Sequence, residues 1–386
     1  MITPSLFVAQ FPANKGYATT AGETLLYQAG MELAQGKQEH VHFAYRGFQQ
    51  GHPASLPRDF SNLIELNFSE EQSCADMETM ILRVTTYVKQ HGIRFVLFND
   101  IQPIHPMFRP LRHAGVSTIL SYWGSTISSL MPAWKLFLKR LEIALSNSRV
   151  DGLIFQAQAM AQLAIDGRGV PERMVDVVPQ GVDVNLYTPG SSDYVYRALS
   201  FPSSRRVIIY AGHMERRKGP HVLVDAAIEL LARRGRKDVC FLLCGNKEGE
   251  SLEYERAYEG MGIDSFIKFG GYRSDLKEIY QSCFCGVVPS SGWDSFPRTS
   301  LELAASGLPV IVSRLGGLPE SIVDGTTGLL FDPGNAKQLA DRIETLLDNP
   351  KLAKEYGEKG RERCVRDLNL ANQLNRLMIA IRRHIH

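Results

Sequence analysis

Three nucleotide-binding signatures are missing from this chain of 386 residues. No G-x-G-x-x-G opens a helix, no G-x-x-x-x-G-K-[ST] occurs, and no Asp-x-Asp pair is present. These absences exclude a dinucleotide-dependent dehydrogenase and a P-loop enzyme, and they remove the usual carboxylate motif for a metal-bound diphosphate. A phosphate bound by this chain must therefore be neutralised by side-chain cations and by helix N-termini.

The chain is also poor in cysteine, in long apolar runs and in net charge. Its six cysteines lie in apolar segments without the paired spacing of a zinc site, which favours buried thiols in a reducing cytosol. No run of about 18 apolar residues occurs, and MITPSLFVAQF has no basic region before its apolar part, so we expect a cytoplasmic protein. A formal net charge of +2 gives no indication of nucleic-acid binding.

The apolar residues that are present indicate the fold. Short runs rich in Val, Ile and Phe alternate with stretches of helical period, a pattern typical of parallel sheets covered by helices. The length exceeds one hydrophobic core, and LYTPGSSDYVYRALSFPSSRR has the composition of a linker. We predict an α/β fold of two Rossmann-like doubly wound domains facing across a cleft. The predicted domains are residues 1–187 and 188–366, with a C-terminal helix at 367–386 that packs back on the first.

Ligands of doubly wound sheets bind beyond the carboxyl ends of the strands, so we expect the functional residues in the loops that follow strands. After the run RVIIY, the segment AGHMERRKG brings Arg216, Arg217 and Lys218 to a strand end just before a helix. A solvated basic turn is the alternative interpretation of these three residues.

A second loop follows the run CFCGVVPSS and carries Asp294. We expect a helix to begin near Pro297, so that the N–H groups of Arg298, Thr299 and Ser300 face an anion. Glu302, inside this helix, can accept hydrogen bonds from a vicinal diol such as a ribose, while Asp294 can reach the other end of the same ligand. A diol, a diphosphate and a second polar group form the layout of a nucleotide sugar. A helix cap at Asp294 with a surface Glu302 is the alternative.

Several ordered blocks resemble the retaining GT-B glycosyltransferases of the family 4 type. VPQGVDVNLYTPG is similar to that family's hinge, with Gln180 in place of Asn, and AGHMERRKG is similar to its donor-phosphate loop. FGGYRSDLKEIYQSCFCGVVPSS, GLPVIVSRLGGLPESIVDGTTGLLFDPGN and LADRIETLLDNP match later blocks in order and spacing. The resemblance covers most of the chain and is strongest from Val177 to Pro350.

The resemblance assigns roles to the residues of both loops. Lys218 would hold the donor diphosphate, Glu302 the ribose, and Asp294 the transferred sugar, at a position where the family normally has Glu. His213 stands where the family has a phosphate-binding arginine, and a neighbouring arginine is expected to supply that charge. We expect Asp294 and Lys218 to be catalytic. The expected donor-binding residues are Glu302, Arg217, Arg216, His213, Gly212, Arg298, Thr299, Ser300, Phe296, Gly245 and Tyr272.

The acceptor side departs further from the family pattern. In LSYWGSTIS, Trp123 and Gly124 occupy a place where the family often carries His, and NKGYATTAG offers Lys15 and Gly16 where two adjacent glycines are common. With Asp100, at the end of the run IRFVLFND, these residues form the expected acceptor side.

The resemblance implies a metal-independent hexosyltransferase of polysaccharide biosynthesis. It would move a sugar from a UDP- or GDP-sugar to a saccharide or lipid-linked saccharide with retention of configuration, and it would need no cofactor and no metal. A nucleotide-sugar 2-epimerase with a similar fold, or a binding-only homologue, is the alternative.

A further expectation is peripheral contact with the inner face of a membrane. In MPAWKLFLKRLEIAL the side chains of Trp134, Phe137, Leu138, Leu141 and Ile143 are predicted to share one helix face flanked by lysine and arginine, although helices of a domain core share that pattern.

Overall fold

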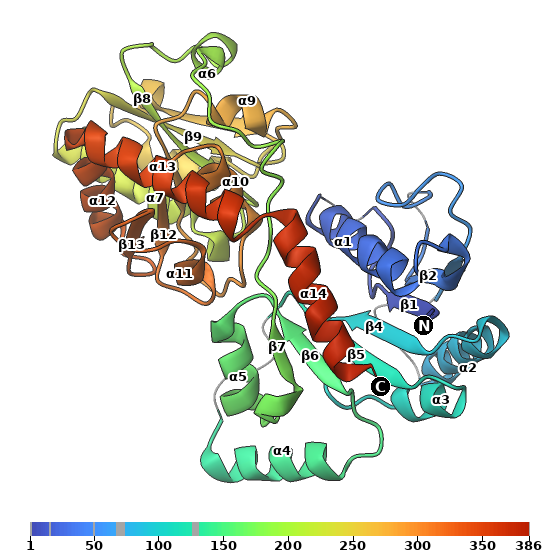
Figure 1. Ribbon diagram of the computed structural model, residues 1–386. Coiled ribbons are helices and arrows are strands. Elements are labelled where there is room, and N and C mark those ends of the chain that lie inside the picture. The colour runs from blue at the N-terminus through green and yellow to red at the C-terminus, as the bar shows by residue number, and fades with distance from the viewer. Residues whose placement is uncertain (1, 15–16, 49–50, 67–73, 126–130, 386) are drawn as a thin grey trace. The chain divides into compact units, whose positions relative to one another are not determined.

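The computed structural model describes residues 2–14, 17–48, 51–66, 74–125 and 131–385. The chain divides into two compact units (Figure 1): unit 1 consists of Met1–Pro179 with Gln373–His386, and unit 2 of Gln180–Asn372. The boundaries between the units fall at 179/180 and 372/373 along the chain. The sequence analysis placed the domain boundaries at 187/188 and 366/367.

Unit 1 contains a seven-stranded sheet in the order β3-β2-β1-β4-β5-β6-β7. All neighbouring strands pair in parallel, and most strand residues are buried because helices cover the sheet. Each strand coincides with an apolar run expected from the sequence. The strands are β1 (Ser5–Val8), β2 (Val41–Tyr45), β3 (Leu63–Glu65), β4 (Phe95–Asn99), β5 (Thr118–Trp123), β6 (Gly152–Phe155) and β7 (Val175–Val177).

Unit 2 contains a six-stranded parallel sheet in the order β10-β9-β8-β11-β12-β13. Counted within the unit this is 3-2-1-4-5-6, the strand order of a Rossmann fold. The expectation of two Rossmann-like domains is therefore confirmed. The strands are β8 (Arg206–Ala211), β9 (Val239–Cys244), β10 (Ile267–Gly271), β11 (Cys285–Val288), β12 (Val310–Ser313) and β13 (Gly328–Phe331).

Helices connect the strands in both units. The helices of unit 1 are α1 (Tyr17–Leu33), α2 (Cys74–His91), α3 (Phe108–His113), α4 (Ala133–Leu145) and α5 (Gln158–Arg168), together with most of α14 (Leu370–His384). Unit 2 contains α6 (Tyr194–Ala198), α7 (Pro220–Ile228), α8 (Leu252–Glu255), α9 (Leu276–Tyr280), α10 (Arg298–Ala305), α11 (Leu318–Ser321), α12 (Ala336–Asp348) and α13 (Pro350–Arg366). A single 3-10 turn, η3 (Arg216–Lys218), precedes α7.

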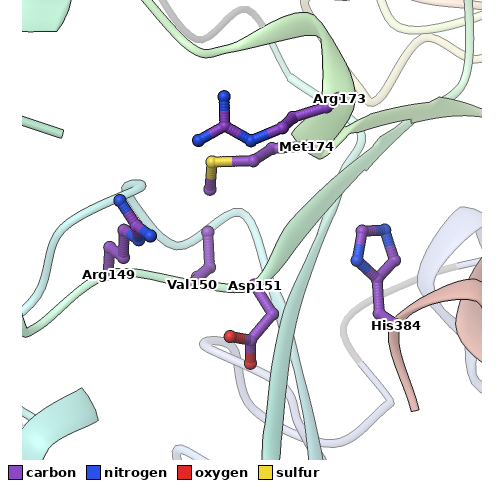
Figure 2. Close-up of a pocket in the computed structure, with 6 residues that line it drawn as sticks. All are labelled: Arg149, Val150, Asp151, Arg173, Met174 and His384. Atoms are coloured by element: carbon purple, nitrogen blue, oxygen red, sulfur yellow. The ribbon is translucent and has the colours of Figure 1, made fainter. Parts of the chain in front are cut away.

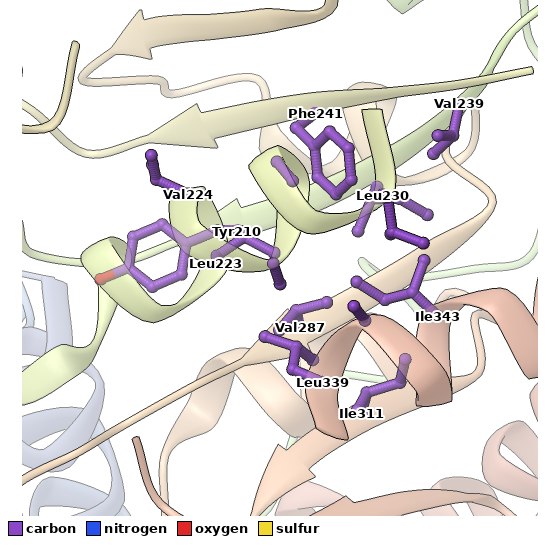
Figure 3. Packing of buried hydrophobic residues seen from close by; sticks show 14 of the residues in the cluster. Tyr210, Leu223, Val224, Leu230, Val239, Phe241, Val287, Ile311, Leu339 and Ile343 are labelled. Atoms are coloured by element: carbon purple, nitrogen blue, oxygen red, sulfur yellow. The ribbon is translucent and has the colours of Figure 1, made fainter. Parts of the chain in front are cut away.

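The core of unit 2 forms where α7 and α12 pack on the sheet (Figure 3). Leu223 of α7 and Leu339 and Ile343 of α12 are fully buried with Phe241 of β9 and Val287 of β11. Burying such side chains supplies roughly 1.5–3 kcal/mol each, which holds the strand ends in fixed register.

The core of unit 1 joins the two ends of the chain. Phe7 of β1 stacks on Phe43 of β2 with ring centroids 5.2 Å apart, and Leu377 and Ile381 of α14 belong to the same buried cluster. The pair of His384 Nε2 with Asp176 Oδ2, at 2.8 Å, ties the end of α14 to β7.

Of the cysteines whose side chains the structure describes, Cys240, Cys244, Cys283, Cys285 and Cys364 are free. Burial raises the pKa of Cys240, Cys244 and Cys364 to about 12, so these thiols stay protonated at neutral pH. Across the described residues, none of the helices has the length and apolarity needed to cross a membrane.

Candidate active site

The strand order of unit 2 reverses between β8 and β11, which pair directly in the centre of the sheet. Loops that leave the carboxyl ends of two such strands diverge and leave a crevice between them. The loop after β8 leads through η3 to α7, and the loop after β11 leads to α10. The two segments that the sequence analysis singled out are therefore neighbours at the switch point.

The two predicted catalytic residues contact each other. Lys218 Nζ lies 2.8 Å from Asp294 Oδ2, and their side chains are 21% and 4% exposed. The hydroxyl of Ser290 donates to the same Oδ2 at 2.7 Å, and the N–H of Ser295 donates to Oδ1 at 3.0 Å. One ammonium, one hydroxyl and one amide thus compensate the buried carboxylate, as a buried charge requires.

Main-chain contacts fix the two loops against each other. The N–H groups of Ser291 and Gly292 donate to the carbonyl of Arg217 at 2.8 and 2.9 Å, and the Ser291 hydroxyl donates to the carbonyl of Arg216 at 3.0 Å. Gly219 has φ 78°, and a Cβ there would lie 1.9 Å from the carbonyl oxygen of Pro289. Only glycine permits this approach of the β8 loop to the β11 loop.

A third loop, which follows β12, also contacts Asp294. The N–H of Gly317 donates to the main-chain carbonyl of Asp294 at 3.2 Å. Gly316 has φ 53°, and a Cβ there would lie 2.0 Å from the same carbonyl oxygen. The glycine pair after β12 therefore positions the carboxylate. Sequence reasoning assigned no role to it, although two adjacent glycines after a strand were a visible signal.

The arginines of η3 differ in their surroundings. Arg217 pairs with Glu215 at 2.6 Å, and its guanidinium carbon lies 4.7 Å from the ring centroid of Trp293. One terminal nitrogen of Arg217 is buried and has no hydrogen-bond partner among the described residues. Arg216 is exposed. Arg217 is therefore the more buried of the two arginines.

The start of the β8 loop is held by its backbone. The N–H of Gly212 donates to the carbonyl of Cys244 at 3.0 Å, and the carbonyl of His213 accepts the Tyr210 hydroxyl at 2.5 Å. The side chain of His213 is exposed. Gly245, at the end of β9, packs on the main chain of Gly212 and donates to the carbonyl of Gly271 at 2.8 Å. Gly212, His213 and Gly245 thus lie at adjacent strand ends.

Helix α10 begins where the sequence predicted. Pro297 precedes it in an extended conformation, and no side chain caps the N–H groups of its first turn. The Thr299 hydroxyl donates to the carbonyl of Ala211 at 3.2 Å, which ties this turn to the end of β8. The Ser300 hydroxyl donates to the carbonyl of Pro297 at 2.8 Å. Arg298 is partly exposed on the same turn.

Glu302 is buried inside α10 and is not a surface residue. Glu302 is 5% exposed, and burial, followed by the charge of Glu302, raises the pKa of Tyr280 well above its usual range. Phe296, in the loop before α10, is also buried. Tyr272 is the outlier of the predicted set, because it is highly exposed after β10, two strands from β8 at the edge of the sheet.

The predicted acceptor-side residues lie in unit 1. The Oδ1 of Asp100, after β4, accepts the N–H groups of Gly124 at 2.8 Å and Ser125 at 3.3 Å, so the ends of β4 and β5 are joined. Partial burial of the carboxyl group raises the pKa of Asp100, although the residue keeps contact with solvent. The hydrogen bonds from Gly124 and Ser125 act in the opposite direction and lower this pKa. Trp123 is buried against Phe155. Lys15 and Gly16 lie outside the described residues.

Two observations concern metals and cavities. Within the ranges that the structure describes, no group of three or more His, Cys, Asp or Glu side chains could hold a metal ion. A cavity of about 150 Å³ lies in unit 1, lined by Arg149, Val150, Asp151, Arg173, Met174 and His384 (Figure 2). It contains none of the predicted site residues.

Residues 196–363, all within unit 2, match the family model described as Glycosyl transferases group 1. D-inositol 3-phosphate glycosyltransferase of Corynebacterium urealyticum is 34% identical over 214 residues, 53% of this chain and 50% of that protein. The protein of the same name from Arthrobacter is 33% identical over 186 residues, 47% and 44% of the two chains. The chain thus spans about half the length of the curated relatives that it matches.

Solved structures match over nearly the whole chain. A glycosyltransferase of Rickettsia africae has a TM-score of 0.81 at 17% identity and covers 98% of both chains. Anabaena HepE in complex with UDP has a TM-score of 0.76 at 18% identity, covering 99% of this chain and 100% of that one. The fold is therefore GT-B, and residues 196–363, fewer than half of the chain, confirm the resemblance to glycosyl transferases group 1.

Proposed function

We propose that this protein is a retaining glycosyltransferase that moves a hexosyl group from a nucleotide diphosphate sugar to a saccharide or lipid-linked saccharide. The observation that carries the proposal is the pair of Lys218 and Asp294, 2.8 Å apart at the switch point of the domain that matches the family. In this proposal Lys218 binds the diphosphate and Asp294 binds the sugar. The two groups that hold a nucleotide sugar are then next to each other.

The proposed reaction breaks the bond between the anomeric carbon and the oxygen of the β-phosphate. The bonding electrons go to the phosphate, and Lys218, Arg217 and the first-turn N–H groups of α10 stabilise the charge that develops there. The acceptor hydroxyl oxygen forms the new bond to the anomeric carbon on the same face, and its proton passes to the departing phosphate. This sequence of events uses no metal ion.

Asp294 and Glu302 act at opposite ends of the donor in this proposal. Asp294 accepts hydrogen bonds from the transferred sugar, and Glu302 accepts them from the ribose. A double-displacement glycosidase would instead place two carboxyls roughly 5 to 5.5 Å apart around a single bond. Burial of both acids, at 4% and 5% exposure, supports specific hydrogen-bonding roles over surface positions.

The relatives support this class of donor and acceptor. The curated relatives are called D-inositol 3-phosphate glycosyltransferases, and HepE was solved with UDP and with UDP-glucose. We infer a UDP- or GDP-sugar as donor. For the acceptor we infer a saccharide, free or lipid-linked, that is extended by a cytoplasmic enzyme in polysaccharide biosynthesis at the inner face of a membrane.

A thermal-shift screen with UDP, GDP, ADP and their sugars tests the donor proposal. A ligand at 100 times its Kd should add about 2.7 kcal/mol to the free energy of unfolding. Stabilisation by a nucleotide sugar and its nucleotide, followed by slow release of the nucleotide, is the expected result. No stabilisation by any member of the set would overturn the proposal.

The two alternative functions differ from the proposed glycosyltransferase in what they do with the donor. A nucleotide-sugar 2-epimerase converts the donor to its epimer without an acceptor, which NMR of the sugar detects. A binding-only protein is stabilised by the donor yet releases no nucleotide, with or without acceptors. Acceptors to be tested with the best donor include D-inositol 3-phosphate, because of the relatives' name, and lipid-linked saccharides.

A further inference from the structure

Helix α4 exposes most of its large apolar side chains. Their exposed fractions are 62% for Trp134, 59% for Phe137, 54% for Leu138, 41% for Leu141 and 78% for Leu145. Positions 134, 137, 138, 141 and 145 follow the i, i+3, i+4 spacing of a single helix face. Contiguous exposed apolar side chains of this kind mark an interaction surface on a protein, whereas single ones do not.

The opposite face of α4 attaches the helix to unit 1. Ile143 is 2% exposed, and α4 packs against α5 (Figure 1). The expectation that Ile143 shares the apolar stripe was wrong, because nine residues from Trp134 rotate it to the other side of the helix. The helix therefore faces unit 1 with the buried Ile143 and the half-buried Leu136 and presents its other five large apolar residues outward.

The charges of α4 flank the exposed stripe. Lys135, Lys139 and Arg140 outnumber the single acid Glu142, which pairs with Lys139. The Lys135 ammonium lies 5.3 Å from the ring centroid of Trp134. An apolar face of Trp, Phe and Leu bordered by cations is suited to the interface of an anionic bilayer.

A basic cavity lies at the C-terminal end of the same helix. Arg149 donates to the carbonyls of Ile143 and Ala144 at 3.1 and 2.9 Å, so it caps α4, and it lines the cavity of Figure 2 together with Arg173. The one acid on the wall, Asp151, is paired with Arg112 at 2.8 Å. The wall thus keeps the positive charge of Arg149 and Arg173, and Arg149 joins it to the last turn of α4.

We propose that α4 docks unit 1 on an anionic phospholipid bilayer. The apolar stripe of Trp134, Phe137, Leu138, Leu141 and Leu145 enters the interface between headgroups and acyl chains, and the cavity lined by Arg149 and Arg173 receives a headgroup phosphate. This inference rests on unit 1 alone and does not depend on the proposed function.

Flotation of the full chain with phosphatidylcholine vesicles, with and without phosphatidylglycerol, tests the inference. We expect binding to vesicles that contain phosphatidylglycerol, and weaker binding when the salt concentration is raised. Phe137→Ser combined with Leu138→Ser should reduce the bound fraction about tenfold, because the insertion of two large side chains is lost. Leu82→Ser with Ile379→Ser is the matched control, since these residues are 67% and 61% exposed on other helices of unit 1.

The headgroup cavity is tested separately. Arg173→Gln should weaken binding to anionic vesicles and leave α4 intact, because Arg149 supplies its cap. Arg109→Gln, an exposed arginine on α3, is the control. Equal flotation of the Arg173 and Arg109 variants would overturn the headgroup role.

Equal recovery of the wild-type chain in the soluble fraction with both vesicle types would overturn the docking surface. Dimerisation in sedimentation experiments that the Phe137 and Leu138 substitutions abolish, without vesicle binding, would assign the stripe to a second copy instead. UDP binding by calorimetry is measured on the same samples. It should be unchanged in all of these variants, which keeps a failed membrane test distinct from a failed donor site.

Discussion

Asp294→Asn should strengthen the binding of a nucleoside diphosphate and weaken that of the complete nucleotide sugar. In the free protein the Lys218 ammonium is occupied by the Asp294 carboxylate at 2.8 Å. A diphosphate must share this cation with a carboxylate that also repels it. The substitution removes the negative charge and keeps the shape, so Ser290 and Ser295 still hold the side chain.

The size of the effect follows from the geometry. If a phosphate oxygen approaches Lys218 as closely as Asp294 does, the two anionic oxygens lie roughly 5 Å apart. Unit charges at that distance repel by about 3 kcal/mol at an effective dielectric constant of 20 and by roughly 0.8 kcal/mol in water. Because Lys218 is 21% exposed, we expect a value near the lower end, about 1 kcal/mol or fivefold tighter UDP binding. The nucleotide sugar loses a charged hydrogen bond of about 1.5–3 kcal/mol, which outweighs this gain.

Titration calorimetry with UDP, GDP and their sugars measures both effects on one sample. Asp341→Asn is the matched control, because it removes one acid of unit 2 that pairs with Arg234 at 2.7 Å, far along the chain in α12. Equal or weaker nucleotide binding by a folded Asp294→Asn variant would refute the reasoning, since it would show that the carboxylate does not compete for Lys218.

Three further predictions concern single residues of the two units. Glu302→Ala should weaken donor binding by about 1.5–3 kcal/mol, roughly 10- to 150-fold, in calorimetry, and an unchanged Kd would reject the ribose role. Gly219→Ala should lower the free energy of unfolding by ~2 kcal/mol or more in urea titrations, because its Cβ meets the Pro289 carbonyl, whereas Gly235→Ala, with φ 70° and open space, should cost less. Burial, and then the charges of His91 and His40, lower the pKa of His42 to about 4, so the native state favours the neutral ring and stability is full above pH 6.5. The free energy of unfolding should fall by roughly 3 kcal/mol as the pH is lowered from 6.5 to about 4. His42→Asn keeps an acceptor for the Tyr87 hydroxyl and should remove this loss. A variant whose stability keeps the same dependence on acid would contradict the assignment.

The strands and the start of α10 could be predicted from the sequence because both depend on local pattern. The runs IRFVLFND, RVIIY and CFCGVVPSS contain the strands β4, β8 and β11, and α10 begins after Pro297 as its composition indicated. Helical period alone excludes Ile143 from the face of Trp134, nine residues away, but it gives no sign of which face meets the protein. Ile143 and Leu141 are equally apolar, yet only Ile143 is buried.

Contacts between loops that are far apart along the chain also could not be predicted from the sequence. The support of Asp294 by Lys218 and Gly317 depends on three loops that converge at one edge of the sheet. Trp293, which stacks on Arg217, carries no local signal because a tryptophan before an acid is compatible with any surface loop. Such contacts are long-range consequences of strand order and of glycine at positions with positive φ.

The two units differ in how closely known families constrain them, and the chemistry of the proposed reaction gives a reason. The family match lies within 196–363, in unit 2, whereas solved structures match 98–99% of the chain at 17–18% identity. A diphosphate that leaves with growing charge demands the same cations and N–H groups whatever sugar it carries, so Lys218 and its loop have few substitutes. An acceptor contributes only a hydroxyl to the reaction, and many side-chain arrangements can hold the remainder of that molecule. The positions of Trp123, Gly124 and Asp100 in unit 1 are thus free to depart from the family pattern while the strand ends that present them stay in place, as the hydrogen bond from Gly124 to Asp100 at 2.8 Å shows.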